Sequence, residues 1–222
     1  MGQKASLNYR PPRLKPRLQA EARATTEKFA GYFLLKDVRR LPHIFDEGSN
    51  LFITWHLYGS LPRQRYPPPG KMNSAAAFVW MDRYLETSRE GPQWLKRTEI
   101  AAVVEEVLPR QECQLHAYVI MPNHVHVLLA PKIPPPKLMQ SIKGASAREA
   151  NKILGILGKP FWQHESYDHS VRTPEEFAKI RRYIENNPVK AGLAATPEDY
   201  RWSSAWSGWR ELQLAAPASA GE

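Results

Sequence analysis

The sequence predicts an α+β fold in which one antiparallel sheet carries helices on one face, and three observations point to it. Segments rich in β-branched and aromatic residues alternate with segments of helical periodicity. Two strand segments are separated only by the turn residues Pro122 and Asn123, which favours an antiparallel hairpin. With 222 residues, 42% of them hydrophobic, the chain is long enough for one core and short for two.

The elements follow one another as strand, two helices, hairpin, helix, strand and helix. We expect strands near 49–59, 112–121, 124–130 and 161–171, and helices over 73–89, 94–108 and 138–157. This order fits a ferredoxin-like α+β sandwich with one helix added after the last strand.

The added helix has recognisable start and stop signals. Thr173 can cap its N-terminus, Pro174 suits the first helical position, and Glu176 can complete a capping box. Pro188 lacks an amide hydrogen and disfavours helical geometry in the residue before it. We therefore expect this helix to end at Asn186 or Asn187.

Positive charge is concentrated near the N-terminus. The formal net charge is +9, and residues 1–40 carry +7 of it, from ten basic and three acidic side chains. We therefore expect a flexible, basic, proline-rich arm over 1–40, one domain over 41–212 and a disordered tail over 213–222. Such an arm suits a polyanion such as nucleic acid, because neutralised phosphates release counterions. A solvated tail without a partner is the alternative.

Membrane and export signals are lacking. No window holds eighteen consecutive apolar residues, and the first seventeen residues contain no apolar core of a secretory signal. We expect a cytoplasmic protein without membrane contact. The single cysteine, Cys113, cannot form an internal disulfide or a cysteine-based zinc cluster.

The stretch YVIMPNHVHVLLA places two histidines in a predicted strand. His124 and His126 share one face of that strand, because side chains alternate between faces. Two imidazoles at this spacing can share a divalent ion. Two separately hydrogen-bonded structural histidines are the alternative. Since two ligands rarely hold an ion, we expect a third ligand elsewhere in the chain.

The last predicted helix offers that ligand. Tyr183 and Asn187 are four residues apart and therefore lie on one face, beside an apolar stripe expected to dock on the sheet. If the helix covers the histidine face, Asn187 can complete the ion site and Tyr183 can reach a substrate there. A partly buried core tyrosine beside a C-terminal asparagine is the alternative.

These residues carry a family resemblance. The triplet His124-Val125-His126 resembles the histidine-hydrophobe-histidine signature of HUH nucleases, and FWQHESYDHSVR followed by YIENNPVKAGL is similar to REP-associated tyrosine transposases. The similarity covers most of the chain. One departure is His56, where similar sequences have arginine.

The resemblance implies a catalytic domain within 41–212 that cleaves and rejoins single-stranded DNA beside hairpins of repetitive extragenic palindromes. It implies a 5′-phosphotyrosine intermediate with Tyr183 as the nucleophile. By matching position, His124, His126 and Asn187 would hold Mg²⁺ or Mn²⁺.

Several basic residues near this machinery are candidates for contact with DNA phosphates: Lys143, Arg148, Lys152, Arg172, Arg181, Arg182 and Lys190. For each of them a solvated surface charge is the alternative. We expect single-stranded DNA or DNA hairpins as partners, no nucleotide cofactor, a monomer rather than a homodimer, and association with the bacterial nucleoid when DNA is bound.

Two other functions compete with this interpretation. A nucleotide hydrolase of the histidine-triad type needs a third histidine at the position of Leu128. A non-catalytic, domesticated DNA-hairpin-binding protein would keep the fold while losing the nucleophile or the ligands. All four proposed residues are present, which argues against the non-catalytic protein. A covalent adduct with DNA would distinguish the nuclease from that binding protein.

Overall fold

The computed structural model describes residues 49–61, 74–88, 90–164 and 166–209. The predicted arm over 1–40 and the predicted tail over 213–222 lie outside these residues. The strands are β1 (Asn50–His56), β2 (Cys113–Ile120), β3 (His124–Pro131) and β4 (Tyr167–Val171). The helices are α2 (Ser74–Thr87), α3 (Thr98–Val107), α4 (Pro135–Leu154) and α5 (Pro174–Lys190), with short 3-10 turns at Trp94–Lys96, Leu108–Arg110 and Pro197–Asp199.

The four strands form one antiparallel sheet in the order β2-β3-β1-β4. The predicted hairpin is confirmed, since β2 and β3 pair directly and are joined by a turn at Pro122 and Asn123. β1 lies between β3 and β4, which is the arrangement of two interleaved strand-helix-strand units. The predicted α+β, ferredoxin-like class is therefore confirmed.

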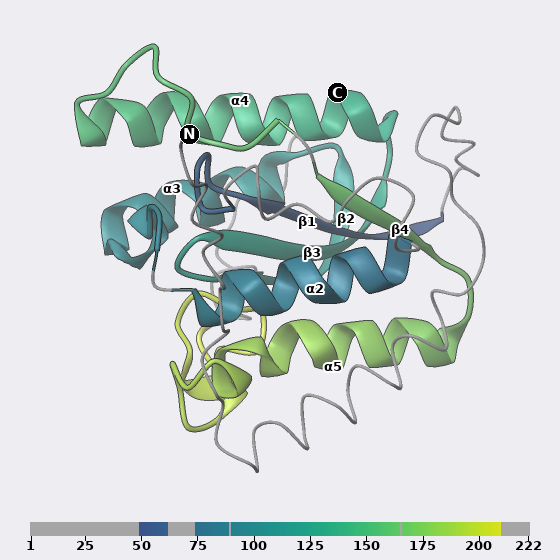
Figure 1. The fold of residues 1–222 in the computed structure, drawn as a ribbon. Helices are drawn as coiled ribbons and strands as arrows, with labels where there is room; N and C mark the ends of the chain where they lie inside the picture. The colour runs from purple at the N-terminus through teal and green to yellow at the C-terminus, as the bar shows by residue number, and fades with distance from the viewer. Residues whose placement is uncertain (1–48, 62–73, 89, 165, 210–222) are drawn as a thin grey trace, which may run out of the picture.

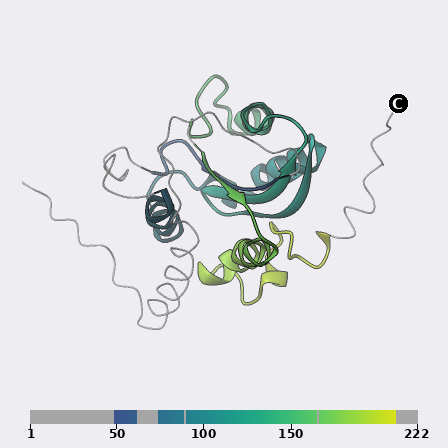
Figure 2. The same cartoon turned by 90° about the vertical axis from the view of Figure 1, so that its right-hand side faces the viewer.

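Helices cover both faces of this sheet (Figure 1). α3 and α4 pack on the face formed by Leu51, Ile53 and Trp55, whereas α2 and α5 pack on the face that contains Phe52. The view along the layers in Figure 2 shows the same separation. The expectation that helices lie on one face was wrong for α2. The physical reason is that β1 is buried on both sides from Leu51 to His56, and two buried faces need two covers.

Two predicted boundaries moved for local reasons. α4 begins three residues earlier than expected because the prolines of its first turn, where no amide donor is needed, are part of the helix. It ends at Leu154, since Gly155 takes the left-handed conformation with φ 68°.

Two other predicted elements are shorter than expected. The helix expected over 94–108 is interrupted, because Arg97 is extended between a 3-10 turn and α3. The strand expected over 161–171 forms only from Tyr167 onward. Before it, Trp162 makes an isolated bridge with Leu57.

α5 starts as predicted and ends later than predicted. The Thr173 side chain accepts a hydrogen bond from the Glu176 amide at 3.2 Å. The capping box is only half formed, because the Glu176 carboxylate accepts instead from the Arg172 amide at 2.8 Å. The helix continues through Pro188 to Lys190. Backbone bonds from Ala191 to Asn187 and from Leu193 to Pro188 close the last turns, so the missing donor of one proline does not end it.

No helix in the described part of the chain is long and apolar enough to cross a bilayer.

Candidate active site

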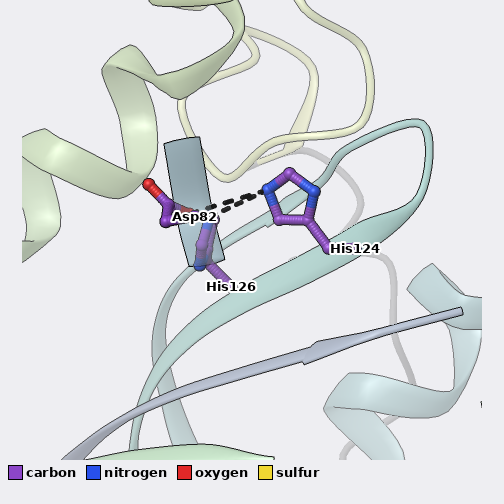
Figure 3. A group of neighbouring side chains, drawn as sticks. All are labelled: Asp82, His124 and His126. Atoms are coloured by element: carbon purple, nitrogen blue, oxygen red, sulfur yellow. Dashed lines mark hydrogen bonds and ion pairs between the residues drawn. The ribbon is translucent and has the colours of Figure 1, made fainter. Parts of the chain in front are cut away.

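The two histidines of β3 converge on one point. His124 and His126 are fully buried on the sheet face that α2 and α5 cover, and their Nε2 atoms are 3.1 Å apart (Figure 3). Burial, followed by the influence of His126, holds the pKa of His124 well below its ordinary value. His124 is therefore neutral, which is the form that binds metal ions.

Neighbouring side chains fix how these imidazoles are turned. His124 Nδ1 donates to Asn123 Oδ1 at 2.7 Å, and the Asn123 amide nitrogen in turn donates to the Leu85 carbonyl at 3.0 Å. His124 Nε2 is therefore left as a lone-pair donor. His126 Nδ1 lies 2.7 Å from Thr54 Oγ1. This hydroxyl can accept a hydrogen bond from Nδ1, which leaves the lone pair of Nε2 directed at the same point.

A carboxylate that sequence reasoning missed completes the cluster. Asp82 of α2 places Oδ1 at 3.1 Å from His126 Nε2 and 4.0 Å from His124 Nε2 (Figure 3). Neighbouring ligands at about 2.1 Å from one octahedral ion are about 3 Å apart, so this spacing fits a shared Mg²⁺ or Mn²⁺. Asp82, His124 and His126 form the only such group of three or more ligand residues in the described chain.

A signal for Asp82 was present in the sequence. It occupies the stripe defined by Phe78 and Leu85, at helical spacing, and all three residues are nearly fully buried. A charged residue on the core-facing stripe of a helix is rarely buried without a partner. Burial by itself would raise the pKa of Asp82, but the hydrogen bond and charge of His126, with the charge of Lys190, hold it below its usual range.

The structure brings Tyr183 to this cluster. Its hydroxyl donates a short hydrogen bond to Asp82 Oδ2, the oxygen that does not face the histidines. Its ring centroid lies 5.6 Å from that of His126 and 6.0 Å from that of Phe52. Burial, followed by the negative charges of Asp82 and Glu86, raises the pKa of Tyr183 well above its ordinary value. Tyr183 is therefore protonated at neutral pH.

Asn187 follows Tyr183 by one turn of α5. Its side chain is fully buried, and within the described residues neither its amide nitrogen nor its oxygen has a hydrogen-bond partner. It acts weakly to lower the pKa of Tyr183, although the two groups do not meet hydrogen-bond geometry. A buried amide without a partner is costly unless a ligand satisfies it, so this environment suits the predicted role of Asn187 as an ion ligand.

Two further charged residues border Tyr183. Lys190 Nζ lies 2.8 Å from Glu86 Oε1, 4.0 Å from Asp82 Oδ2 and 5.4 Å from the centre of the Tyr183 ring. Burial, then the charge of Asp82, raises the pKa of Glu86 to about 8. Burial opposes the charged form of Lys190, but Glu86 and Asp82 together raise its pKa.

The predicted DNA-contact residues do not form one patch. Lys143, Arg148 and Lys152 belong to α4, on the sheet face opposite Tyr183, and Lys143 donates to the carbonyls of Gln163 and His164 at 3.1 and 3.0 Å. Lys143 therefore fixes a loop. The remaining four are near α5: Arg172, Arg181 and Arg182 are exposed, and Lys190 is partly buried at the site. Exposed ion pairs join Lys152 to Glu149 and Arg181 to Glu185.

A third histidine lies beside the cluster. His56 pairs with His124 across β1 and β3, is 2% exposed, and has Nδ1 at 3.0 Å from Ser60 Oγ. Burial lowers its pKa to about 4, so it is neutral at physiological pH.

Comparisons with known proteins identify the family of the chain. A protein-family profile described as "Transposase IS200 like" matches residues 70–187, which is more than half of the chain. A comparison with the curated proteins finds no match.

Two solved structures are similar to this chain. A REP-associated tyrosine transposase bound to a REP hairpin has 18% identity and a TM-score of 0.50, over 85% of this chain and 93% of that one. A protein from Deinococcus radiodurans R1, named only provisionally as a transposase, has 18% identity and a TM-score of 0.33, over 69% of this chain and 98% of that one. The first supports the fold, and the family match confirms the resemblance drawn from the sequence: the chain belongs to the IS200-like transposase family.

Proposed function

We propose that this protein cleaves and rejoins single-stranded DNA through a 5′-phosphotyrosine formed on Tyr183. One observation carries the proposal: the two oxygens of Asp82 join the histidine cluster to the tyrosine hydroxyl. Family membership supports a transposase-type function on DNA. A structural neighbour holds a REP hairpin, which supports a single strand beside a DNA hairpin as the substrate class.

The residues that would hold Mg²⁺ or Mn²⁺ are His124, His126, Asp82 and Asn187. Imidazole, carboxylate and amide oxygen are a donor set that suits these ions. When bound, the ion polarises the scissile phosphate and offsets negative charge on its oxygens. Asp82 is an addition to the set predicted from the sequence, and Asn187 keeps its predicted place.

The chain's own residues account for the remaining steps. The Tyr183 oxygen attacks phosphorus, and the bond from phosphorus to the 3′ oxygen breaks. The Tyr183 proton leaves along its hydrogen bond to Asp82 Oδ2 and is taken up by solvent, and the released 3′ oxygen takes a proton from solvent. The new bond between tyrosine and the 5′ phosphate conserves a phosphodiester, so another 3′ hydroxyl can displace Tyr183 without ATP.

The site also keeps Tyr183 inactive before substrate binds. Forming phenolate from an ordinary tyrosine at pH 7 costs about 4 kcal/mol, and burial and the Asp82 carboxylate increase that cost for Tyr183. Asp82, His124, His126 and Asn187 would hold the cation whose charge offsets much of this cost, so cleavage should depend on an occupied site.

The test uses labelled DNA hairpins with single-stranded flanks, Mn²⁺ and denaturing gels. We expect a covalent protein–DNA adduct that mass spectrometry assigns to Tyr183. Tyr183→Phe should bind the same hairpins without forming the adduct, and excess EDTA should abolish the adduct in the wild-type protein. Tight hairpin binding without any adduct would favour the domesticated DNA-binding protein. Full cleavage by Tyr183→Phe would falsify the tyrosine mechanism.

A further inference from the structure

Two buried acidic side chains of α2, Asp82 and Glu86, lie near Tyr183. Asp82 and Glu86 are one helical turn apart on one face of α2, and their side chains are only 4% and 6% exposed. Two acidic groups this close repel each other when both are charged. A cation between them reduces the repulsion, and Lys190 from α5 lies within 2.8 Å of Glu86 and 4.0 Å of Asp82.

The same lysine lies over the nucleophile. Lys190 follows Tyr183 by seven residues, about two turns, so both side chains are on one side of α5. Its Nζ is 5.4 Å from the centre of the Tyr183 ring. This placement exists only because α5 runs through Pro188 and keeps Lys190 helical.

We propose that Lys190 is a positioning residue for the reaction of Tyr183, and that Glu86 holds it in place. As the Tyr183 oxygen loses its proton, negative charge grows on that oxygen beside the Asp82 carboxylate. The Lys190 ammonium is fixed next to this charge and does not need to reorganise, which is the arrangement that gives electrostatic stabilisation its strength. This inference rests on the proposed function and adds residues to which nothing in the sequence assigned this role.

An ordinary structural ion pair is the competing explanation. A buried lysine–glutamate pair between two helices can simply hold α2 against α5. Removing one partner then destabilises the fold, because it leaves a buried charge without compensation, whereas removing both is often neutral. If Lys190 acts on Tyr183, removing both partners should restore stability but not the reaction rate. If the pair is only structural, stability and rate should recover together.

The experiment compares Lys190→Met, Lys190→Arg, Glu86→Gln and the double variant Glu86→Gln/Lys190→Met. Arg110→Met, which removes an exposed arginine–glutamate pair at the end of α3, is the matched control. For each protein we would measure denaturant stability, the Kd for the hairpin that gives the wild-type adduct, and the single-turnover rate of adduct formation with Mn²⁺.

We expect Lys190→Met to lower the adduct rate by about 10²-fold while hairpin Kd changes by less than about threefold. Lys190→Arg should restore the rate to within about tenfold of wild type, because its charge is kept. The double variant should recover stability without recovering rate. Glu86→Gln should lower the rate by less than Lys190→Met, because Lys190 keeps its charge but loses its anchor. Arg110→Met should keep the wild-type rate.

Two results would overturn the inference alone. One is recovery of rate and stability together in the double variant. The other is a Lys190→Met rate within about threefold of wild type. A wild-type protein that forms no adduct, or an adduct that persists in Tyr183→Phe, would instead overturn the proposed function and the role of Lys190 with it.

Discussion

Asp82 presents its two oxygens to different partners. Oδ1 faces the histidines and Oδ2 receives the Tyr183 hydroxyl. In the proposed mechanism, a carboxylate in this position would raise the affinity of the site for a cation and would also hold the Tyr183 hydroxyl beside it. Replacing Asp82 by asparagine removes the negative charge and keeps the shape, so the effect of charge can be measured apart from that of packing.

Asp82→Asn should therefore weaken Mn²⁺ binding by about 10- to 100-fold, since a neutral amide is a poorer ligand for a hard cation. Isothermal titration of Mn²⁺ into the DNA-free protein measures the change directly. Glu149→Gln, at an exposed position of α4, is the control. Unchanged affinity in Asp82→Asn would mean that the histidines and Asn187 suffice.

His56 makes folding sensitive to acid. Its folded pKa of about 4 is below the unfolded value of 6.5, so between these values the unfolded chain binds a proton that the folded chain does not. The contribution of neutral His56 is thus complete above pH 6.5 and is lost as pH falls toward 4.

We expect the free energy of unfolding to fall by about 2 kcal/mol between pH 7 and pH 5 because of His56 alone. Urea denaturation at the two pH values, in EDTA, should show a smaller fall in His56→Gln than in the wild-type protein. Equal falls in the two proteins would remove His56 as a source of the acid sensitivity.

At the scale of single residues, the sequence pointed to some members of the buried cluster and not to others. His124, His126, Tyr183 and Asn187 are recognisable because strand and helix periodicities place each pair on one face. Asp82 was not predicted because its partners, His124 and His126, are more than forty residues away in the chain and only the fold brings them together.

Among the elements, α5 carries Tyr183, Asn187 and Lys190, and its first turn is fixed by a few contacts. Thr173 accepts from the Glu176 amide, and the Glu176 carboxylate binds His169 Nε2 at 2.7 Å and the Arg172 amide. The end of β4 and the start of α5 are thus tied together.

Thr173→Ala should lower the free energy of unfolding by about 1 kcal/mol, because the Glu176 amide loses its cap. Urea denaturation measures this loss, and Thr173→Ser should retain most of the stability. Mn²⁺ affinity should not change, since the cap is several turns from the site. A neutral Thr173→Ala would show that the Glu176 contacts alone hold the turn.

The opposite end of α5 shows where local rules fail. Pro188 predicts a helix end, because an interior proline costs about 3 kcal/mol in an isolated helix. In the folded chain Pro188 and Asn187 are buried, and the backbone bonds after the proline continue. Packing of this end of α5 against the sheet therefore outweighs the local tendency of proline to end a helix.

The whole molecule protects one edge of its sheet with its own C-terminal segment. Ile120 N donates to the Trp202 carbonyl at 2.8 Å and Ser204 N donates to the Tyr118 carbonyl at 3.0 Å, so this segment covers the outer side of β2. Arg201 secures it with a two-point ion pair to Glu105 at 2.5 and 2.8 Å. A covered edge is unavailable for pairing with a second sheet.

We therefore expect the protein to remain a monomer, and a chain truncated after Asp199 to self-associate with increasing concentration. Size-exclusion chromatography with light scattering distinguishes the two. A chain truncated after Trp209 keeps the covering segment and serves as the control. Monomeric behaviour of the shorter chain would show that the β2 edge is not what controls assembly.

Asn123 links the assembly of the site to the docking of one helix. Its amide holds the Leu85 carbonyl of α2 on one side and the His124 ring on the other. Docking of α2 therefore supplies Asp82 and also fixes the tautomer of His124. If docking of α2 increases the affinity of the site for a cation, then binding of that cation must stabilise docked α2 by the same free energy. Ion occupancy and local folding are then two measures of one equilibrium.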